Sequence, residues 1–259
     1  MIPHRKRAQS LRTRKGRVSS GELLIEGVRL IEDALEADVQ VRQLYHLPTE
    51  AGSRLDTLVT RASSANTPCA EVTAEELLNL SDTQTPQGVV AIVEQPKWTV
   101  EDVEANGVGD VLILDAVRDP GNVGTLLRTA EAAGARGVIA TRGTVEMSNP
   151  KVVRGSMGAY FRLPTCVVSE TSEIVRLCGN VGLPIVTTSL QGADAVGALA
   201  GHDSVALVLG GEAEGISSDW RDAGAIDVRI PMRGSVESLN VAAAGAVLLF
   251  RRIWRIPER

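Results

Sequence analysis

Residues 115–128 contain the first group of side chains that could carry chemistry. Asn122, flanked by Gly121 and Gly124, stands at the start of a predicted helix that carries Arg128. The backbone N–H groups at a helix start attract anions, and glycines let a ligand approach the backbone closely. A guanidinium can donate two parallel hydrogen bonds to a phosphate. This stretch therefore predicts an anion site, with an ordinary capped helix and an exposed arginine as the simpler alternative.

A second polar stretch, residues 209–217, places Glu212 and Glu214 among three glycines directly after an apolar run. Carboxylates held in such a turn can accept hydrogen bonds from a hydroxyl or an amine. A solvent-exposed turn has the same composition, so both interpretations stay open at this point.

The third stretch, residues 230–241, leads from a predicted strand into a predicted helix. Ser238 is a suitable N-cap for that helix, which we expect to end near Ile253. Apolar residues recur at helical spacing and predict one buried face, formed by Leu239, Ala242, Ala246, Phe250 and Ile253. The small residues between them would let another backbone approach closely.

The position of these three stretches depends on the strands and helices that precede them. Strands that are apolar throughout are typical of a parallel sheet covered on both faces, and we expect them at residues 111–114, 137–140, 166–168, 184–187, 205–209 and 226–230. Helices are expected between them, at residues 123–133, 150–157 and 172–178. Ligands of open α/β sheets bind beyond the carboxyl ends of the strands, so the polar stretches are expected to converge there.

The first part of the chain predicts a separate, smaller α/β domain, at residues 21–96. Helices are expected at residues 22–37, 54–63 and 74–80, and strands at 45–47, 71–72 and 87–93. Residues 97–109, rich in acidic residues and glycine, predict a linker to a second, larger domain at residues 110–259.

Residues 1–20 are predicted to form a basic arm, although the whole chain has a formal net charge of −5. Eight basic residues precede the first acidic one: His4, Arg5, Lys6, Arg7, Arg12, Arg14, Lys15 and Arg17. Such a cluster is typical of contact with a nucleic-acid backbone. A solvated, frayed tail would have the same composition, and both interpretations stay open.

Composition excludes several other classes of protein. Although 44% of the residues are hydrophobic, no apolar run reaches the ~20 residues that a membrane helix needs, and no secretory signal is present, so we expect a cytoplasmic protein. The three cysteines and three histidines lack the spacing of a disulfide framework or a metal site. The chain also lacks a Gly-x-Gly-x-x-Gly or Walker pattern, which argues against a nucleotide-dependent dehydrogenase.

Taken in order, the three polar stretches resemble the motifs of the SpoU/TrmH-type SPOUT RNA 2'-O-ribose methyltransferases, in the branch that acts on 23S-like ribosomal RNA. The residues that carry the resemblance are Asn122-x-Gly124-x-x-x-Arg128, Leu209-Gly210-Gly211-Glu212-x-x-Gly215 and Ile230-Pro231-Met232-x-Gly234-x-x-x-Ser238-Leu239-Asn240-Val241. Residues 85–91 are similar to the end of the RNA-binding domain of ribosomal-RNA members.

The resemblance implies an α/β fold in two parts: an N-terminal L30e-like substrate-binding domain and a C-terminal SPOUT domain with a trefoil knot. It implies S-adenosyl-L-methionine as the cofactor, RNA as the substrate, above all ribosomal RNA, and a homodimer with its site at the subunit interface. Neither a membrane nor a metal is implied.

The resemblance also assigns residues to the site. It implies that Leu209, Gly210, Gly211, Ile230, Met232, Ser238 and Leu239 bind the cofactor. It implies a catalytic or RNA-facing role for Asn122, Arg128, Glu212, Ser238 and Asn240. Arg128 would either take the proton of the ribose hydroxyl or clamp a neighbouring phosphate.

Two alternative functions are compatible with the same motifs. One is a transfer-RNA 2'-O-methyltransferase, which the sizeable N-terminal domain disfavours. The other is a non-catalytic RNA-binding or ribosome-assembly protein that retains the knot, which the intact catalytic set disfavours. Both housekeeping modification and an antibiotic-resistance role fit these residues.

Overall fold

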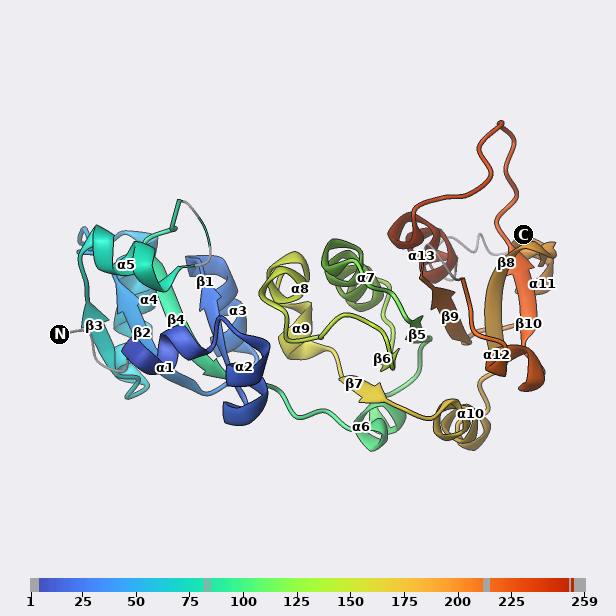
Figure 1. Cartoon of the computed structure of the whole chain (residues 1–259), viewed down its shortest axis with the longest axis horizontal. Coiled ribbons are helices and arrows are strands. Elements are labelled where there is room, and N and C mark those ends of the chain that lie inside the picture. Colours follow the sequence, from blue (N-terminus) through green and yellow to red (C-terminus); the bar gives the residue numbers. More distant parts are fainter. Residues whose placement is uncertain (1–4, 82, 84, 212–214, 252, 254–259) are drawn as a thin grey trace. The chain divides into compact units, whose positions relative to one another are not determined.

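The computed structural model describes residues 5–81, 83, 85–211, 215–251 and 253 of the chain (Figure 1). The chain divides into two compact units, each of which is described on its own. The first comprises residues Met1–Pro96 and Ser148–Phe161, and the second comprises Lys97–Met147 and Arg162–Arg259.

The first unit is built on a mixed four-stranded sheet of order β1-β4-β2-β3. Its strands are β1 (Glu22–Glu26), β2 (Val41–His46), β3 (Cys69–Glu71) and β4 (Val89–Glu94). Strand β4 pairs antiparallel with β1 and β2, whereas β2 and β3 are parallel. Its longer helices are α3 (Val28–Glu36), α4 (Arg54–Ser64) and α5 (Ala74–Leu80), and α8 (Pro150–Gly155) and α9 (Ala159–Arg162) follow later in the sequence.

The helix predicted over residues 22–37 is wrong in its first part, because Glu22–Glu26 forms strand β1. Gly27 separates this strand from α3. Its φ is +99°, a backbone conformation that glycine adopts readily and residues with a Cβ atom do not. A Cβ atom on Gly27 would also lie 2.5 Å from Oε1 of Gln87. The helical spacing of the apolar residues is thus overridden by pairing with β4.

The described part of the basic segment forms two helices, α1 (Arg5–Ser10) and α2 (Arg14–Ser20). Ala8 and Leu11 are fully buried in the core of the first unit, where they belong to one apolar cluster with Tyr45 and Leu77. The frayed-tail alternative is therefore wrong for these residues.

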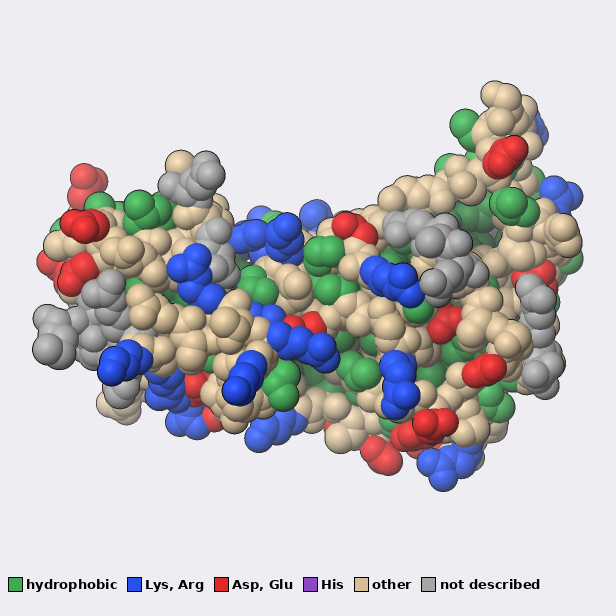
Figure 2. All heavy atoms as spheres, in the orientation of Figure 1, with side chains coloured by type: hydrophobic (Ala, Val, Ile, Leu, Met, Phe, Trp, Pro, Cys, Tyr) green, Lys and Arg blue, Asp and Glu red, His purple; other side chains and the backbone are tan. Residues whose placement is uncertain are grey.

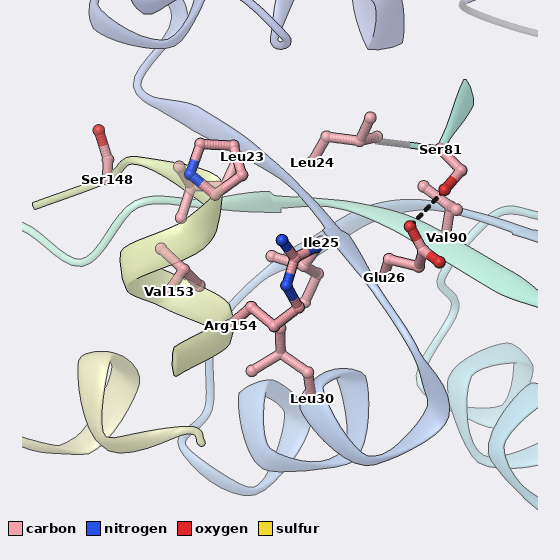
Figure 3. Close-up of a pocket in the computed structure, with 11 residues that line it drawn as sticks. Leu23, Leu24, Ile25, Glu26, Leu30, Ser81, Val90, Ser148, Val153 and Arg154 are labelled. Carbon is pink, nitrogen blue, oxygen red and sulfur yellow. Dashed lines mark hydrogen bonds between the residues drawn. The ribbon is translucent and has the colours of Figure 1, made fainter. Parts of the chain in front are cut away.

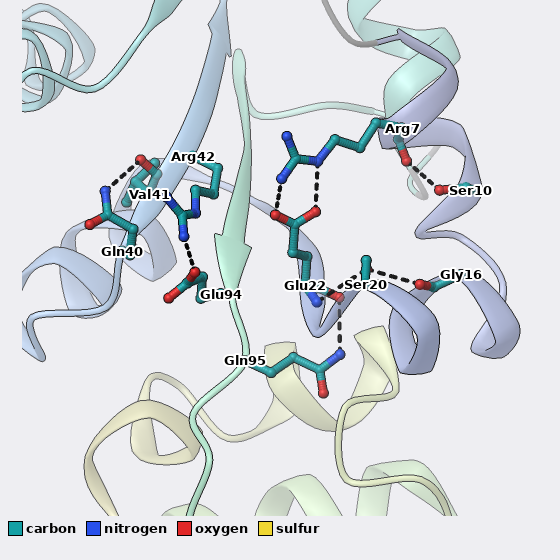
Figure 4. Close-up of polar contacts among 10 residues, drawn as sticks. All are labelled: Arg7, Ser10, Gly16, Ser20, Glu22, Gln40, Val41, Arg42, Glu94 and Gln95. Atoms are coloured by element: carbon teal, nitrogen blue, oxygen red, sulfur yellow. Dashed lines mark hydrogen bonds and ion pairs between the residues drawn. The ribbon is translucent and has the colours of Figure 1, made fainter.

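Two of the basic side chains hold these helices in place, and Figure 4 draws the first of them, Arg7, with its partner Glu22. Arg7 forms a two-pronged ion pair with Glu22, whose side chain is only 6% exposed. Arg17 is buried and donates to the backbone oxygen of Leu11 at 3.1 Å. Arg7 and Arg17 are thus structural residues of the first unit, whereas Lys6 and Lys15 are exposed.

The second unit contains a six-stranded sheet of order β10-β8-β9-β5-β6-β7, in which every pair is parallel. Its strands are β5 (Val111–Asp115), β6 (Gly137–Thr141), β7 (Thr165–Val168), β8 (Ile185–Asp194), β9 (Ala206–Gly210) and β10 (Ile226–Arg229). The parallel α/β sheet predicted from the apolar runs is confirmed. Its helices are α6 (Val100–Ala105), α7 (Pro120–Ala132), α10 (Thr171–Asn180), α11 (Ala195–Ala198), α12 (Asp219–Asp222) and α13 (Val241–Phe250).

The last helix differs from its prediction at both ends. Asn240, not Ser238, caps α13, and the helix ends at Phe250 rather than at Ile253. Leu239 and Ile253, which were predicted on its buried face, lie outside it and are 39% and 55% exposed. The side-chain oxygen of Asn240 accepts from the backbone N–H groups of Ala242 and Ala243, which is the capping role predicted for Ser238.

Helix α13 is held to the sheet by close packing and by a buried ion pair. A Cβ atom on Gly245 would overlap Cδ2 of Leu126 in α7 and lie 2.9 Å from Cδ1 of Leu209 in β9, so a larger residue would require these leucines to move. At the far end, Arg251 donates to both carboxylate oxygens of Asp110, at 2.7 and 2.9 Å.

Among the described residues, no helix is long and apolar enough to cross a membrane.

Candidate functional site

Helix α7 begins with residues that leave its first turn well capped. Oδ1 of Asp119 accepts a hydrogen bond from the backbone N–H of Asn122 at 2.8 Å, and Pro120 occupies the first helical position, where no N–H is needed. Asn122 is half-buried, and this bond holds its backbone in the first turn of α7, which follows the carboxyl end of β5.

The side chain of Asn240 joins the third polar stretch to the first. Its Nδ2 donates a hydrogen bond to Oδ1 of Asn122 at 3.1 Å, across 118 positions of sequence. Its Oδ1 accepts from the backbone N–H groups of Ala242 at 2.9 Å and Ala243 at 3.4 Å. One amide therefore caps α13 and sets the relative position of two of the predicted catalytic side chains.

The described residues of the second polar stretch, 210–211 and 215–217, lie beside the end of β5. A Cβ atom on Gly210 would overlap the backbone of Gly215, and one on Gly211 would lie 2.6 Å from the backbone oxygen of Ala116. The N–H of Gly211 donates to the backbone oxygen of Asp115 at 3.0 Å, and Gly215 N–H donates to the oxygen of Gly211 at 3.0 Å. Glu212, predicted as catalytic, lies outside the described residues.

Asp115 is a residue that sequence reasoning missed. It is buried at the end of β5, and its carboxylate accepts hydrogen bonds from Thr141 Oγ1 at 2.9 Å, Ser217 N at 2.8 Å and Trp220 Nε1 at 3.1 Å. The only signal in the sequence was a carboxylate that directly follows an apolar strand.

The third stretch presents an exposed backbone with apolar side chains beside it. Residues 231 and 233–240 are exposed, while Ile230 and Met232 are half-buried. The backbone groups of residues 232–239 form no hydrogen bond with any other part of the chain that the structure describes. Val236 and Leu239 are 60% and 39% exposed. Free backbone donors and acceptors beside apolar surface are what a heteroaromatic ring needs for binding.

Arg128 stands apart from the asparagine pair. It is exposed on α7 and makes no hydrogen bond or ion pair with another described residue. Six residues separate it from Asn122, which in an α-helix is a rotation of about 600°, so the two side chains point about 120° apart. The structure thus brings Asn122 and Asn240 together, and does not bring Arg128 into contact with them.

A cleft in the first unit is unrelated to the predicted residues (Figure 3). It is lined mainly by apolar side chains of β1 together with Val153 and Arg154 of α8, and none of the predicted site residues contributes to it. No group of three or more His, Cys, Asp or Glu side chains that could hold a metal is found in the described ranges.

Comparison with known proteins identifies two family regions in the chain. Residues 110–250 match the SpoU rRNA Methylase family, and residues 3–91 match the MRM3-like substrate binding domain. The chain belongs to the SpoU rRNA methylase family. The predicted family resemblance and the predicted fold class are thereby confirmed for this SpoU family member, while its trefoil knot stays a prediction.

Relatives of this SpoU methylase span almost its whole length. The 23S rRNA (guanosine(2553)-2'-O)-methyltransferase RlmP of Bacillus subtilis is 30% identical over 93% of this chain and 92% of its own. The 23S rRNA (uridine(2479)-2'-O)-methyltransferase of Streptomyces viridochromogenes is 31% identical over 94% of this chain and 86% of its own.

Solved structures give the same result. The SpoU methyltransferase AviRb from Streptomyces viridochromogenes, in complex with the cofactor AdoMet, superposes with a TM-score of 0.85 at 30% identity, over 100% of both chains. An AdoMet-bound rRNA methyltransferase from Sinorhizobium meliloti has a TM-score of 0.84 at 30% identity, over 96% of this chain and 94% of its own.

Proposed function

We propose that this protein is an S-adenosyl-L-methionine-dependent methyltransferase that methylates a ribose 2'-hydroxyl of RNA, with ribosomal RNA as its substrate. The family match and the names of the two relatives, both 23S rRNA 2'-O-methyltransferases, support the activity and the substrate. The structural observation that carries the proposal is the hydrogen bond between Asn240 and Asn122, because it unites two motif side chains at one edge of the sheet.

The third stretch has the properties that S-adenosylmethionine requires. Its backbone donors and acceptors in residues 232–239 have no partner in the described chain, and its apolar side chains are exposed, which suits an adenine ring. When bound, this cofactor supplies a methyl group that is already activated on a sulfonium. The residues that would hold it are Leu209, Gly210, Gly211, Ile230, Met232, Ser238 and Leu239.

The remaining task of the protein is to align the ribose oxygen with the methyl carbon and to let the hydroxyl proton leave. Asn122, Ser238 and Asn240 present amide and hydroxyl groups that can orient a ribose, and Glu212 is assigned with them. Arg128 is assigned as a clamp on a neighbouring phosphate, because a guanidinium keeps its charge in proteins and can bind two phosphate oxygens at once.

A homodimer is part of the proposal. Arg128 points away from Asn122 within its own chain, so a second subunit or the RNA itself is needed to bring the guanidinium to the reacting ribose. Helix α13 leaves Ala243 and Val247 exposed one turn apart, a surface of small apolar residues that suits close packing of a second copy. With a ribosomal substrate, the expected location is the cytoplasm.

Two measurements test the proposed function. Calorimetry should detect binding of S-adenosylmethionine to the purified protein. Mapping of 2'-O-methylation in cells with and without the gene should reveal a ribosomal nucleotide whose methylation depends on the gene. Binding without any missing methyl group would favour a non-catalytic RNA-binding role, and a missing group on a transfer RNA would replace the ribosomal substrate.

A further inference from the structure

Asp115 contacts both ends of the glycine-rich loop that follows β9. At the start of the loop, its backbone oxygen accepts from the N–H of Gly211 at 3.0 Å. At the end of the loop, its Oδ2 accepts from the N–H of Ser217 at 2.8 Å. A single residue of β5 is therefore bonded to both flanks of a loop that lies about a hundred positions further along the chain.

The surroundings of Asp115 hold its carboxylate in one orientation. Oδ1 accepts from Thr141 Oγ1 at the end of β6, and Oδ2 also accepts from the indole N–H of Trp220, which is fully buried. Asp115 itself is 6% exposed and forms no ion pair with any described residue. A buried carboxylate is costly unless its oxygens are satisfied, and here uncharged donors from three other segments satisfy them.

The residue after Asp115 adds a second constraint on the same loop. Ala116 has a φ of +55°, which is unfavourable for a residue with a side chain, and its N–H donates to Thr141 Oγ1 at 3.3 Å. This turn directs the oxygen of Ala116 toward Gly211, where a Cβ atom would be only 2.6 Å away. Strain of this kind persists only where the neighbouring bonds enforce it.

We propose that Asp115 is a positioning residue for methyl transfer, which holds the two described flanks of this loop, residues 210–211 and 215–217, in the geometry that binds S-adenosylmethionine. The inference rests on the proposed function, since it assumes that this loop contacts the cofactor. Asp115 acts through hydrogen bonds to the loop and not by touching the substrate. Its carboxylate matters as an acceptor of several hydrogen bonds, and its charge is secondary.

Three variants test whether Asp115 acts as a hydrogen-bond acceptor for the loop or through its negative charge. Asp115→Ala removes all three side-chain acceptor bonds. Asp115→Asn can keep them, because the amide oxygen can face Ser217 and Trp220 while its NH₂ group donates to Thr141 Oγ1. Trp220→Phe removes one bond to the same carboxylate and leaves both bonds to the loop, so it is the matched control for the removal of a buried hydrogen bond outside the loop.

The experiment measures S-adenosylmethionine affinity by calorimetry, kcat and KM on RNA, and amide hydrogen exchange, at a temperature where circular dichroism shows each variant folded. Asp115→Ala should raise the Kd for S-adenosylmethionine at least tenfold and speed exchange of the Ser217 amide, whose acceptor it removes, at least tenfold. Asp115→Asn and Trp220→Phe should each stay within about threefold of the wild-type Kd. Exchange in the sheet of the first unit should not change.

Other outcomes overturn the inference. These are a folded Asp115→Ala with wild-type affinity, equal decreases in affinity in Asp115→Ala and Trp220→Phe, or an Asp115→Asn as impaired as the alanine variant. If Asp115→Ala does not fold, the wild-type protein still tests the inference. Unprotected Gly211 and Ser217 amides in the wild type would show that Asp115 does not hold the loop. If the wild-type protein protects these amides but does not bind S-adenosylmethionine, the proposed function is wrong, whereas the hydrogen bonds between Asp115 and the loop are confirmed.

Discussion

The side chain of Asn240 forms hydrogen bonds in two directions, to the first turn of its own helix α13 and to Oδ1 of Asn122 in α7. Its oxygen accepts from the helix backbone, whereas its NH₂ group donates to Asn122 at 3.1 Å. The two ends of one amide thus serve stability and site geometry separately. Substitutions at this position can remove one role and keep the other.

We predict that Asn240→Ser keeps the stability of the protein and loses most of its methyltransferase activity. Serine is a good N-cap but is too short to reach Asn122, so the melting temperature should stay close to that of the wild type. Asn240→Ala should lose the cap as well, at a cost of about 1 kcal/mol. Thermal unfolding and a methyl-transfer assay on ribosomal RNA measure both effects.

Asn122→Ala is the matching control, since it removes the same inter-helix bond from the other side and leaves the α13 cap intact. It should resemble Asn240→Ser in both assays. An active Asn240→Ser protein beside an inactive Asn122→Ala protein would show that the bond between them is not what activity requires.

Arg128 is expected to matter for activity and not for folding. It is exposed and has no partner among the described residues, so its replacement should change the free energy of unfolding by no more than about 0.5 kcal/mol. Arg128→Lys should lower kcat/KM about 10- to 100-fold, because a hydrogen bond to a charged group contributes about 1.5–3 kcal/mol and lysine cannot form the two-pronged contact. A pH–rate profile near that of the wild type, with near-normal activity, would exclude the clamp.

The parallel sheet and the placement of the polar stretches could be predicted because they depend on local patterns. Strands buried on both faces have continuous apolar runs, and the ends of such strands are where ligands bind. Asn122 and Asn240 could therefore be assigned to one edge of the sheet from sequence. Their bond could not, since it depends on how α13 packs against α7 around Gly245.

Other features depended on partners that are distant in sequence. Strand β1 has helix-like spacing, and only its pairing with β4, where Glu22 lies opposite Glu94, makes it a strand. Helices α1 and α2 show few apolar residues among many charged ones, yet Ala8 and Leu11 are core residues. Asp115 receives its donors from three segments far along the chain, so no local pattern marks its role.

The burial of the three cysteines predicts the order in which a thiol reagent labels them. Burial raises the pKa of the Cys166 and Cys178 thiols to about 12, while Cys69 is only half-buried. In native protein at pH 8, iodoacetamide should label Cys69 first and leave the other two unmodified, as peptide mass spectrometry would show. Labelling of Cys166 or Cys178 at the rate of Cys69 would contradict their burial.

The same thiols predict how stability changes at alkaline pH. Their pKa is higher in the folded chain than in the unfolded chain, and burial also raises the pKa of Tyr45 to about 12. The folded state therefore binds these protons more tightly than the unfolded state does. The resulting contribution to the free energy of unfolding is fully present below about pH 9 and is lost as the pH rises toward 12. Urea unfolding at several pH values should show a falling midpoint over this window, and a constant midpoint would contradict the raised values.

The basic face of α1 and α2 is expected to bind RNA phosphates through its exposed lysines. Figure 2 shows lysine and arginine side chains exposed on the face where Figure 1 draws these helices. Deleting residues 1–20 would remove Ala8 and Leu11 from the core and so cannot isolate this role. The sharper change is the double substitution Lys6→Gln and Lys15→Gln, since both side chains are exposed.

The double lysine variant should weaken RNA binding and lower the slope of log affinity against log salt by about 0.7–0.9 for each phosphate that the protein no longer neutralises. Its affinity for S-adenosylmethionine and its melting temperature should not change. The control with equal charge change is Arg54→Gln with Arg61→Gln, on α4 of the same unit, because these arginines pair with Glu32 and Glu36. If the control lowers the slope as much as the lysine variant does, binding depends on net charge alone, and α1 and α2 do not form a specific contact surface.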